Sequence, residues 1–126
     1  VINGEKVQVF GDGEQRRSFT YIDDVIEALI KLIDLNSSDT FNIGSNNTVS
    51  LNRVIEIIKQ KTEIEPIITY KERALKDPDV VKPDLDHIKE CLGWEPSTLI
   101  DDGVEKTVAW YLENSELLKS LTYIKK

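Results

Sequence analysis

One run of residues, from 11 to 25 (GDGEQRRSFTYIDDV), constrains this chain more than any other segment, because it joins a glycine turn, two arginines and a helix start. The residues before it, Val7 to Phe10, favour an extended strand, and Asp12-Gly13 is a turn signal. Arg17 to Phe19 could return as a second strand. We therefore expect a hairpin with basic side chains beside its turn.

The adjacent arginines, Arg16 and Arg17, make this predicted hairpin a candidate anion site. A guanidinium is planar and always charged, and it can contact two phosphate oxygens at once. Glycines beside it let another group approach the main chain. The alternative, left open by the spacing, is a surface hairpin whose arginines pair with Glu14 and Asp12.

The composition limits what such a site can belong to. With 126 residues, 40% of them hydrophobic, the chain can form one small domain with a core. Its formal net charge of -7 argues against a nucleic-acid partner, although an acidic protein can bind a small anion through a local basic site. The sequence has neither a long apolar run nor a signal peptide, so we expect no membrane span and a cytoplasmic location.

The single cysteine and the single histidine predict neither an internal disulfide nor a metal cluster. Both fall on a predicted short helix, where we interpret Cys91 as a small core residue and His87 as a solvated side chain. The paired acids Asp23-Asp24 fit the start of a helix better than acid–base chemistry.

Hydrophobic periodicity predicts the order of the remaining elements. We expect a helix over 22–36, a short strand over 40–43, a helix capped by Ser50, a strand over 64–70, a short helix from Asp84 to Gly93, and a longer helix that starts in a capping box at Thr98. The buried stripe of that last helix is predicted to comprise Ile100, Val104, Val108, Tyr111 and Leu112. This order indicates an α/β or α+β chain with short strands and about four helices.

The sequence has no Gly-x-Gly-x-x-Gly run, no P-loop and no Tyr-x-x-x-Lys pair. It therefore has no dinucleotide-binding fingerprint of its own, and we predict no catalytic residue, no bound cofactor and no metal site within it.

Five segments, in order, resemble the C-terminal, substrate-binding portion of the extended short-chain dehydrogenase/reductases that act on nucleotide sugars. They are residues 9–25, 41–44 (FNIG), 82–84 (KPD), 92–96 (LGWEP) and 103–111 (GVEKTVAWY). That family includes UDP-glucose and UDP-glucuronate 4-epimerases, UDP-glucuronate decarboxylases and dTDP-glucose 4,6-dehydratases. The resemblance implies that residues 1–126 form one small domain, a fragment of a larger enzyme whose NAD-binding Rossmann core lies outside it; the missing initiator methionine agrees with this expectation.

The resemblance also implies six contacts to a UDP-sugar or dTDP-sugar, made by Gln8, Val9, Phe10, Arg17, Asn42 and Arg73. The strand before the glycine turn would lie along the base, Arg17 would hold the diphosphate, and Arg73 would reach the nucleotide or the diphosphate. The asparagine would lie near the substrate. Trp94 would be structural and would pack the short helix against the body of the domain.

The implied chemistry is reversible oxidation of the sugar at C4 by NAD, performed with the missing N-terminal domain, so the fragment alone is expected to be inactive. A 4-epimerase is the favoured subclass. Val81 stands where the decarboxylases carry an arginine, which argues against decarboxylation, whereas residues 107–114 also resemble the dTDP-glucose dehydratases. A stand-alone, non-catalytic binding module is a further alternative. The full-length protein is expected to be a homodimer, and the isolated piece to expose apolar faces that lean on the missing domain.

Overall fold

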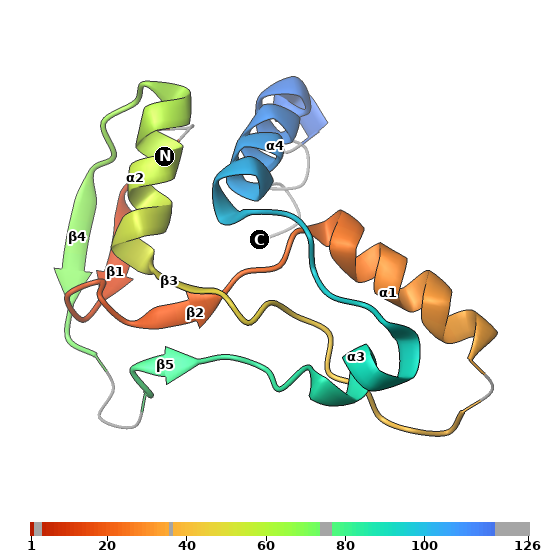
Figure 1. Ribbon diagram of the computed structural model, residues 1–126. Helices are drawn as coiled ribbons and strands as arrows, with labels where there is room; N and C mark the ends of the chain where they lie inside the picture. The colour runs from red at the N-terminus through yellow and green to blue at the C-terminus, as the bar shows by residue number, and fades with distance from the viewer. Residues whose placement is uncertain (2–3, 36, 74–76, 118–126) are drawn as a thin grey trace, which may run out of the picture.

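The computed structural model describes residues 1, 4–35, 37–73 and 77–117. Short strands alternate with four helices among these residues (Figure 1), which confirms the predicted fold class. The elements are β1 (Val7–Phe10), β2 (Arg16–Ser18), α1 (Ile22–Asp34), β3 (Thr48–Ser50), α2 (Leu51–Thr62), β4 (Ile68–Lys71), β5 (Val80–Val81), α3 (Asp86–Leu92) and α4 (Ile100–Glu113).

The five strands form two small sheets. β1 pairs in parallel with β4, with Val9 opposite Tyr70. β2 lies between β3 and β5, so that Arg17 is opposite Val49 on the antiparallel side and opposite Val81 on the parallel side. The predicted hairpin is therefore wrong, because β1 and β2 belong to different sheets and each finds its hydrogen-bond partners in later segments.

The glycine turn redirects the chain from one sheet to the other. Gly11 and Gly13 both have positive φ, 80° and 81°, a conformation that side-chain-bearing residues rarely adopt. The turn packs on the first turn of α2, where Asn52 Nδ2 donates to the Asp12 carbonyl (3.0 Å) and Asn52 N–H donates to the Gly13 carbonyl (3.1 Å). A Cβ atom on Gly13 would lie only 2.1 Å from Asn52 Oδ1, so the turn requires glycine at this position.

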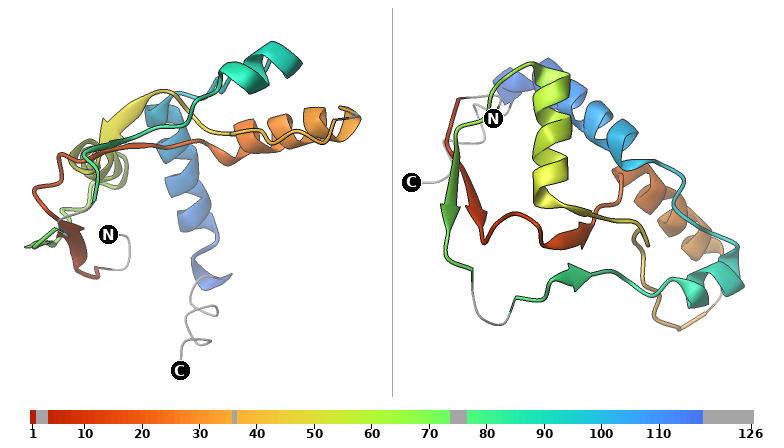
Figure 2. Two further views of the ribbon diagram at one scale, coloured as in Figure 1. Left: turned by 90° about the horizontal axis from the view of Figure 1, so that it is seen from below. Right: turned by 60° about the vertical axis from the view of Figure 1, so that its left-hand side comes forward.

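The core is divided between the two ends of the molecule. At one end α1 and α3 lie side by side (Figure 2), around a buried cluster of Ala28, Leu85, Ile88 and Trp94. Trp94 is 1% exposed, which confirms the expectation that it packs the short helix against the body. At the other end α2 packs against α4 and buries Ile57 and Val108.

Several local signals are confirmed by the main-chain geometry. Ser50 Oγ accepts a hydrogen bond from Arg53 N–H (3.2 Å), as an N-cap should. Gly93 ends α3 with φ of 60° in the left-handed region. The expected end of the first helix at 35–36 agrees with α1, whose C-cap is Leu35, while residue 36 lies outside the described residues.

Other predictions are wrong where contacts with residues distant in the sequence determine the local structure. Residues 40–43 are not a strand, because Phe41 and Ile43 pack on the Trp94 cluster instead of joining a ladder. The predicted strand at 64–70 shortens to β4, and β5 forms where no strand is predicted. Thr98 does not cap α4, because its hydroxyl and main-chain N–H both bind Asp24.

Two predictions about burial also fail. Tyr111 and Leu112 are 43% and 49% exposed, because α4 contacts α2 only along the face that contains Gly103 and Val108. Cys91 is exposed as well, since α3 presents Ile88 rather than Cys91 to the core. His87 is exposed as predicted, with its ring stacked on Phe41 at 4.7 Å between centroids.

The helix α1 has one apolar face that this chain leaves open. Ala28 is buried against the Trp94 cluster, whereas the opposite side exposes Ile22, Ile26, Leu29, Ile30 and Ile33. Ile33 is 82% exposed. An apolar stripe of this length is typical of a surface that packs against other protein. None of the helices in the described part of the chain is long and apolar enough to cross a membrane.

Candidate functional site

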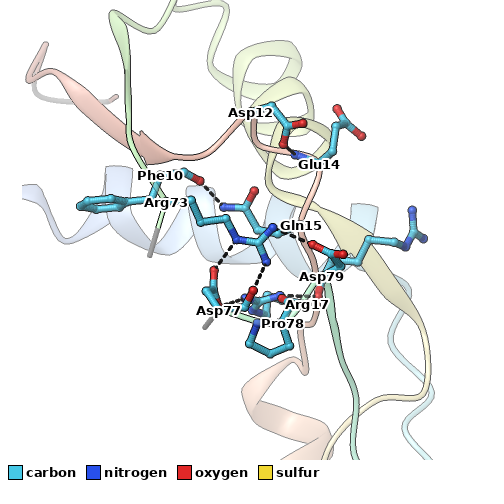
Figure 3. Close-up of polar contacts among 10 residues, drawn as sticks. Phe10, Asp12, Glu14, Gln15, Arg17, Arg73, Asp77, Pro78 and Asp79 are labelled. Carbon is cyan, nitrogen blue, oxygen red and sulfur yellow. Dashed lines mark hydrogen bonds and ion pairs between the residues drawn. The ribbon is translucent and has the colours of Figure 1, made fainter. Parts of the chain in front are cut away.

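Two arginines from separate parts of the sequence converge on one carboxylate (Figure 3). Arg17 lies on β2, the middle strand of its sheet, and Arg73 follows β4. Arg17 Nη2 contacts Asp77 Oδ1 at 2.5 Å, and Arg73 Nε contacts Asp77 Oδ2 at 2.9 Å. The structure thus brings together the two arginines that the sequence singled out; their contact with a diphosphate stays a prediction.

Both guanidinium groups are held on more than one side. Arg17 Nη1 also donates to the carbonyls of Arg16 (2.8 Å) and Pro78 (3.0 Å). Arg73 packs against the turn, since a Cβ on Gly11 would lie 3.1 Å from Arg73 Cδ, so glycine makes room for it. Its Nη1 contacts Asp79 Oδ1 at 2.7 Å, and its Nη2 donates to the Asp77 carbonyl at 2.6 Å.

The contacts between these side chains shift the pKa values of Arg73 and Asp77. Hydrogen bonds to Asp79 and Asp77 raise the pKa of Arg73. The pKa of Asp77 is lowered, chiefly by its hydrogen bond from Arg73 and also by the charge of Arg17. Both shifts favour the charged forms, the Arg73 guanidinium and the Asp77 carboxylate, at neutral pH.

Each guanidinium keeps donors for another group. Within the described part of the chain, Arg17 and Arg73 each use three of the five N–H groups that a guanidinium carries. The remaining N–H groups, with the positive charge of the two side chains, suit an anion that carries several oxygen atoms.

A cavity of about 370 Å³ lies beside Arg17. Its walls include Ser18 on β2, Gly44, and Pro83 of the Lys-Pro-Asp segment. Gly44 and Pro83 are in close contact, because a Cβ on Gly44 would lie 2.6 Å from Pro83 Cγ. Two of the segments that carried the family resemblance thus meet next to Arg17.

The predicted base-binding strand presents its residues unequally. Val9 is 2% exposed and belongs to the core, so a ligand would meet only its main chain. Gln8 is exposed and Phe10 is 53% exposed, and the alternation of a strand places both on the other face of β1. The Phe10 carbonyl accepts a hydrogen bond from Gln15 Nε2 (2.6 Å), which attaches β1 to the segment that leads into Arg17.

Asn42 has a structural contact of its own. Its Nδ2 donates to the Asp84 carbonyl (3.1 Å), and this bond joins the 41–44 segment to the Lys-Pro-Asp segment. The structure does not bring its side chain to the two arginines, and its contact with substrate stays a prediction.

Sequence reasoning missed Asp77, which bridges the two arginines. The available signal was the pair of acids, Asp77 and Asp79, that follows Arg73 within six residues. The sequence analysis also missed the role of Asp24, a buried carboxylate that fastens α1 to the segment before α4. Among the described residues, no cluster of three potential metal ligands is present.

The family model described as GDP-mannose 4,6 dehydratase matches residues 1–107 of this chain. A UDP-glucuronate 4-epimerase from Thermodesulfobacterium geofontis is 35% identical over 116 residues, which are 91% of this chain and 36% of the relative. UDP-glucuronic acid decarboxylase 1 of Xenopus tropicalis is 33% identical over 125 residues, which are 99% of this chain and 30% of the relative. The chain thus spans about a third of the length of these relatives.

A solved structure, MoeE5 in complex with UDP-glucuronic acid and NAD, superposes with a TM-score of 0.82 at 27% identity, over 90% of this chain and 38% of that protein. The matched elements and the shared segments agree with the C-terminal portion that the sequence resembled. The chain belongs to the GDP-mannose 4,6 dehydratase family, whose members are NAD-dependent nucleotide-sugar epimerases, dehydratases and decarboxylases of the extended short-chain dehydrogenase/reductase type.

Proposed function

We propose that residues 1–126 are the substrate-binding part of an NAD-dependent nucleotide-sugar 4-epimerase, in which Arg17 and Arg73 hold the diphosphate of a UDP-sugar. The observation that carries this proposal is the convergence of two arginines from separate segments, one on β2 and one after β4, on one anionic group, Asp77. A diphosphate offers each guanidinium its own phosphate oxygens, which is the geometry that paired arginines bind best. We refer to Arg17 and Arg73 together as the arginine clamp.

The base would lie along the exposed face of β1. Gln8 supplies a polar amide there, and Phe10 supplies an aromatic ring on which a pyrimidine can stack. The hydrogen bond from Gln15 Nε2 to the Phe10 carbonyl links β1 to the segment that leads into Arg17, which supports neighbouring positions for the base and the diphosphate. The similarity to a protein named UDP-glucuronate 4-epimerase supports a uridine nucleotide as the ligand of this chain.

A specific contact favours epimerisation over decarboxylation. Val81 lies directly opposite Arg17 in the β2–β5 register. The family resemblance implies an arginine at this position in the decarboxylases, whereas this chain carries an apolar side chain there. The clamp of this chain therefore lacks a third cation at that point. The second candidate is a dTDP-glucose 4,6-dehydratase, which the sequence of residues 107–114 resembles.

The residues of this chain do not fit NAD. The sequence has no dinucleotide-binding glycine motif, so we assign NAD binding and the chemistry at C4 to a part of the longer protein outside these 126 residues. The contribution of this chain is remote binding: the energy gained at the base and the diphosphate positions the sugar for the reaction. Without that part, the chain should be inactive.

The exposed stripe of α1 is the surface to which we assign this missing part. It presents five large apolar side chains, and the relatives contain about twice as much sequence again as this chain covers. Packing of the cofactor-binding part on α1 would bury this stripe and place the two halves of the active site together.

The proposal is tested by titrating the chain with UDP and following the heat of binding. Arg17→Ala should weaken binding by about tenfold or more, because hydrogen bonds between charged groups are lost. Arg16→Ala is a matched control, since Arg16 is the neighbouring arginine and contacts Thr48 instead of the clamp. Equal loss in both variants, or no loss in Arg17→Ala, would refute the clamp. In the full-length protein, a C4-inverted product from UDP-glucuronate without release of carbon dioxide would identify the epimerase.

A further inference from the structure

We propose that the Asp77 carboxylate is a competitive occupant of the arginine clamp, which a nucleoside diphosphate must displace in order to bind. This inference rests on the proposed function, because it concerns the same two arginines. It assigns Asp77 a role opposite to that of a ligand-binding residue: the side chain opposes binding of the diphosphate.

The geometry of Asp77 is that of a substitute anion. Its two carboxylate oxygens are divided between the two guanidinium groups, Oδ1 on Arg17 and Oδ2 on Arg73. A bridging phosphate would place its oxygens in the same way. The Pro78 carbonyl and the Asp79 carboxylate take further donors of the same two side chains, at 3.0 and 2.7 Å.

The segment 77–79 therefore supplies the clamp with two carboxylates and two main-chain carbonyls. The two carboxylates balance the charge of the two arginines without any ligand. An incoming diphosphate either shares the clamp with two like charges at short range, which is unfavourable, or replaces Asp77.

The structure indicates which partner in the contact moves when a ligand binds, the arginines or Asp77. Arg17 is fixed in the middle strand of its sheet, and Arg73 is packed against Gly11. The main chain of the acidic segment is attached to β2 where Arg16 N–H donates to the Asp79 carbonyl (2.7 Å). Its side chains are more open: that of Asp79 is 90% exposed, and β5, which follows it, is a two-residue strand at the edge of the sheet. Short edge segments with few buried contacts open at low cost in free energy. The arginines can thus stay in place while Asp77 moves away.

The test is a UDP titration of the whole chain with Asp77→Asn, which keeps the shape of the side chain and removes its charge. We expect Kd for UDP to fall about fivefold, the upper end of what an exposed ion pair contributes. The gain should appear in the association rate, since the contact is lost before UDP enters, with little change in the dissociation rate. Asp79→Asn, which affects Arg73 alone, should give a smaller gain in the same direction.

Glu72→Gln is the matched control. Glu72 is the exposed neighbour of Arg73, and the substitution makes the same change in net charge. It should leave Kd unchanged, and a gain equal to that of Asp77→Asn would overturn the proposal in favour of a general charge effect.

Two further outcomes separate this proposal from the proposed function. If wild type binds UDP, Arg17→Ala weakens binding as expected, and Asp77→Asn also weakens binding or leaves it unchanged, the clamp stands and competition by Asp77 is refuted. If neither wild type nor Asp77→Asn binds UDP, the clamp and the competition fail together. Thermal unfolding of each variant checks that it is folded, and Asp79→Asn provides the test if Asp77→Asn is not.

Discussion

Replacing Asp24 by alanine should destabilise the chain more than the same replacement of any other acidic residue. Asp24 is 4% exposed at the start of α1 and accepts four hydrogen bonds from the segment that precedes α4. Ser97 donates through its N–H (3.4 Å) and its hydroxyl (3.2 Å), and Thr98 donates through its N–H (3.1 Å) and its hydroxyl (3.1 Å). The carboxylate thus holds the two helices in their relative positions.

The expected loss follows from what the truncation leaves behind. The two hydroxyl groups can turn to water, whereas the main-chain N–H groups of Ser97 and Thr98 lose their carboxylate acceptor, and Thr98 is half-buried. Leaving such donors unpaired costs about 1–3 kcal/mol each, so we expect a total of about 2–3 kcal/mol because Ser97 itself is exposed. For a chain of this length that corresponds to a fall in Tm of about 8–11 °C.

Urea unfolding followed by circular dichroism measures this change directly. Asp23→Ala is the control, because Asp23 is the exposed neighbour in the same helical turn and should cost no more than about 0.5 kcal/mol through the helix dipole. A double-mutant cycle with Thr98→Val should give a coupling energy of about 0.5–1.5 kcal/mol. If Asp24→Ala costs no more than Asp23→Ala, or if the two changes in the cycle are additive, the account of this contact is wrong.

Three other predictions follow from single contacts. Gly13→Ala should destabilise the chain by about 2–3 kcal/mol in the same assay, because alanine would need positive φ and would collide with Asn52; a loss below about 0.5 kcal/mol would show that the turn relaxes freely. Ile33→Asp should leave stability unchanged and reduce self-association in sedimentation experiments, since Ile33 is 82% exposed; a large loss of stability would mean that this face is already packed. Because Arg73 lowers the pKa of Asp77, the stabilisation from this ion pair should be present above about pH 4 and lost as the pH falls below the ordinary carboxyl range. The difference in urea midpoint between wild type and Asp77→Asn should therefore narrow with falling pH, and a difference that does not change with pH would contradict this.

The sequence predicted best those features that depend on neighbouring residues. The apolar spacing in α1, the cap at Ser50 and the left-handed stop at Gly93 are local, and the structure confirms each of them. Strand pairing was not predictable in this way. β1 pairs with β4, some sixty residues later, and nothing in the sequence of Val7 to Phe10 specifies that partner.

In the candidate site, too, features that depend on local sequence were predicted and those that depend on long-range contacts were not. Arg17 belongs to a local sequence motif, whereas Arg73 was assigned only through the family resemblance; the structure places the two side chains together. Asp77 was missed because it acts through a contact between β2 and the segment after β4, which only the assembled fold creates. Asp24 was interpreted as a favourable charge at a helix start, and its partners lie more than seventy residues away.

Nuclear magnetic resonance of the arginine side chains can show whether the arginine clamp holds the diphosphate. UDP is added to the isotope-labelled chain, and the Nε–H signals of Arg17, Arg73 and Arg16 are followed. The clamp predicts saturable shifts of the Arg17 and Arg73 signals with one common Kd, while the signal of Arg16, whose Nε contacts Thr48, changes little. Saturable binding of UDP that leaves the Arg17 and Arg73 signals unchanged would contradict it.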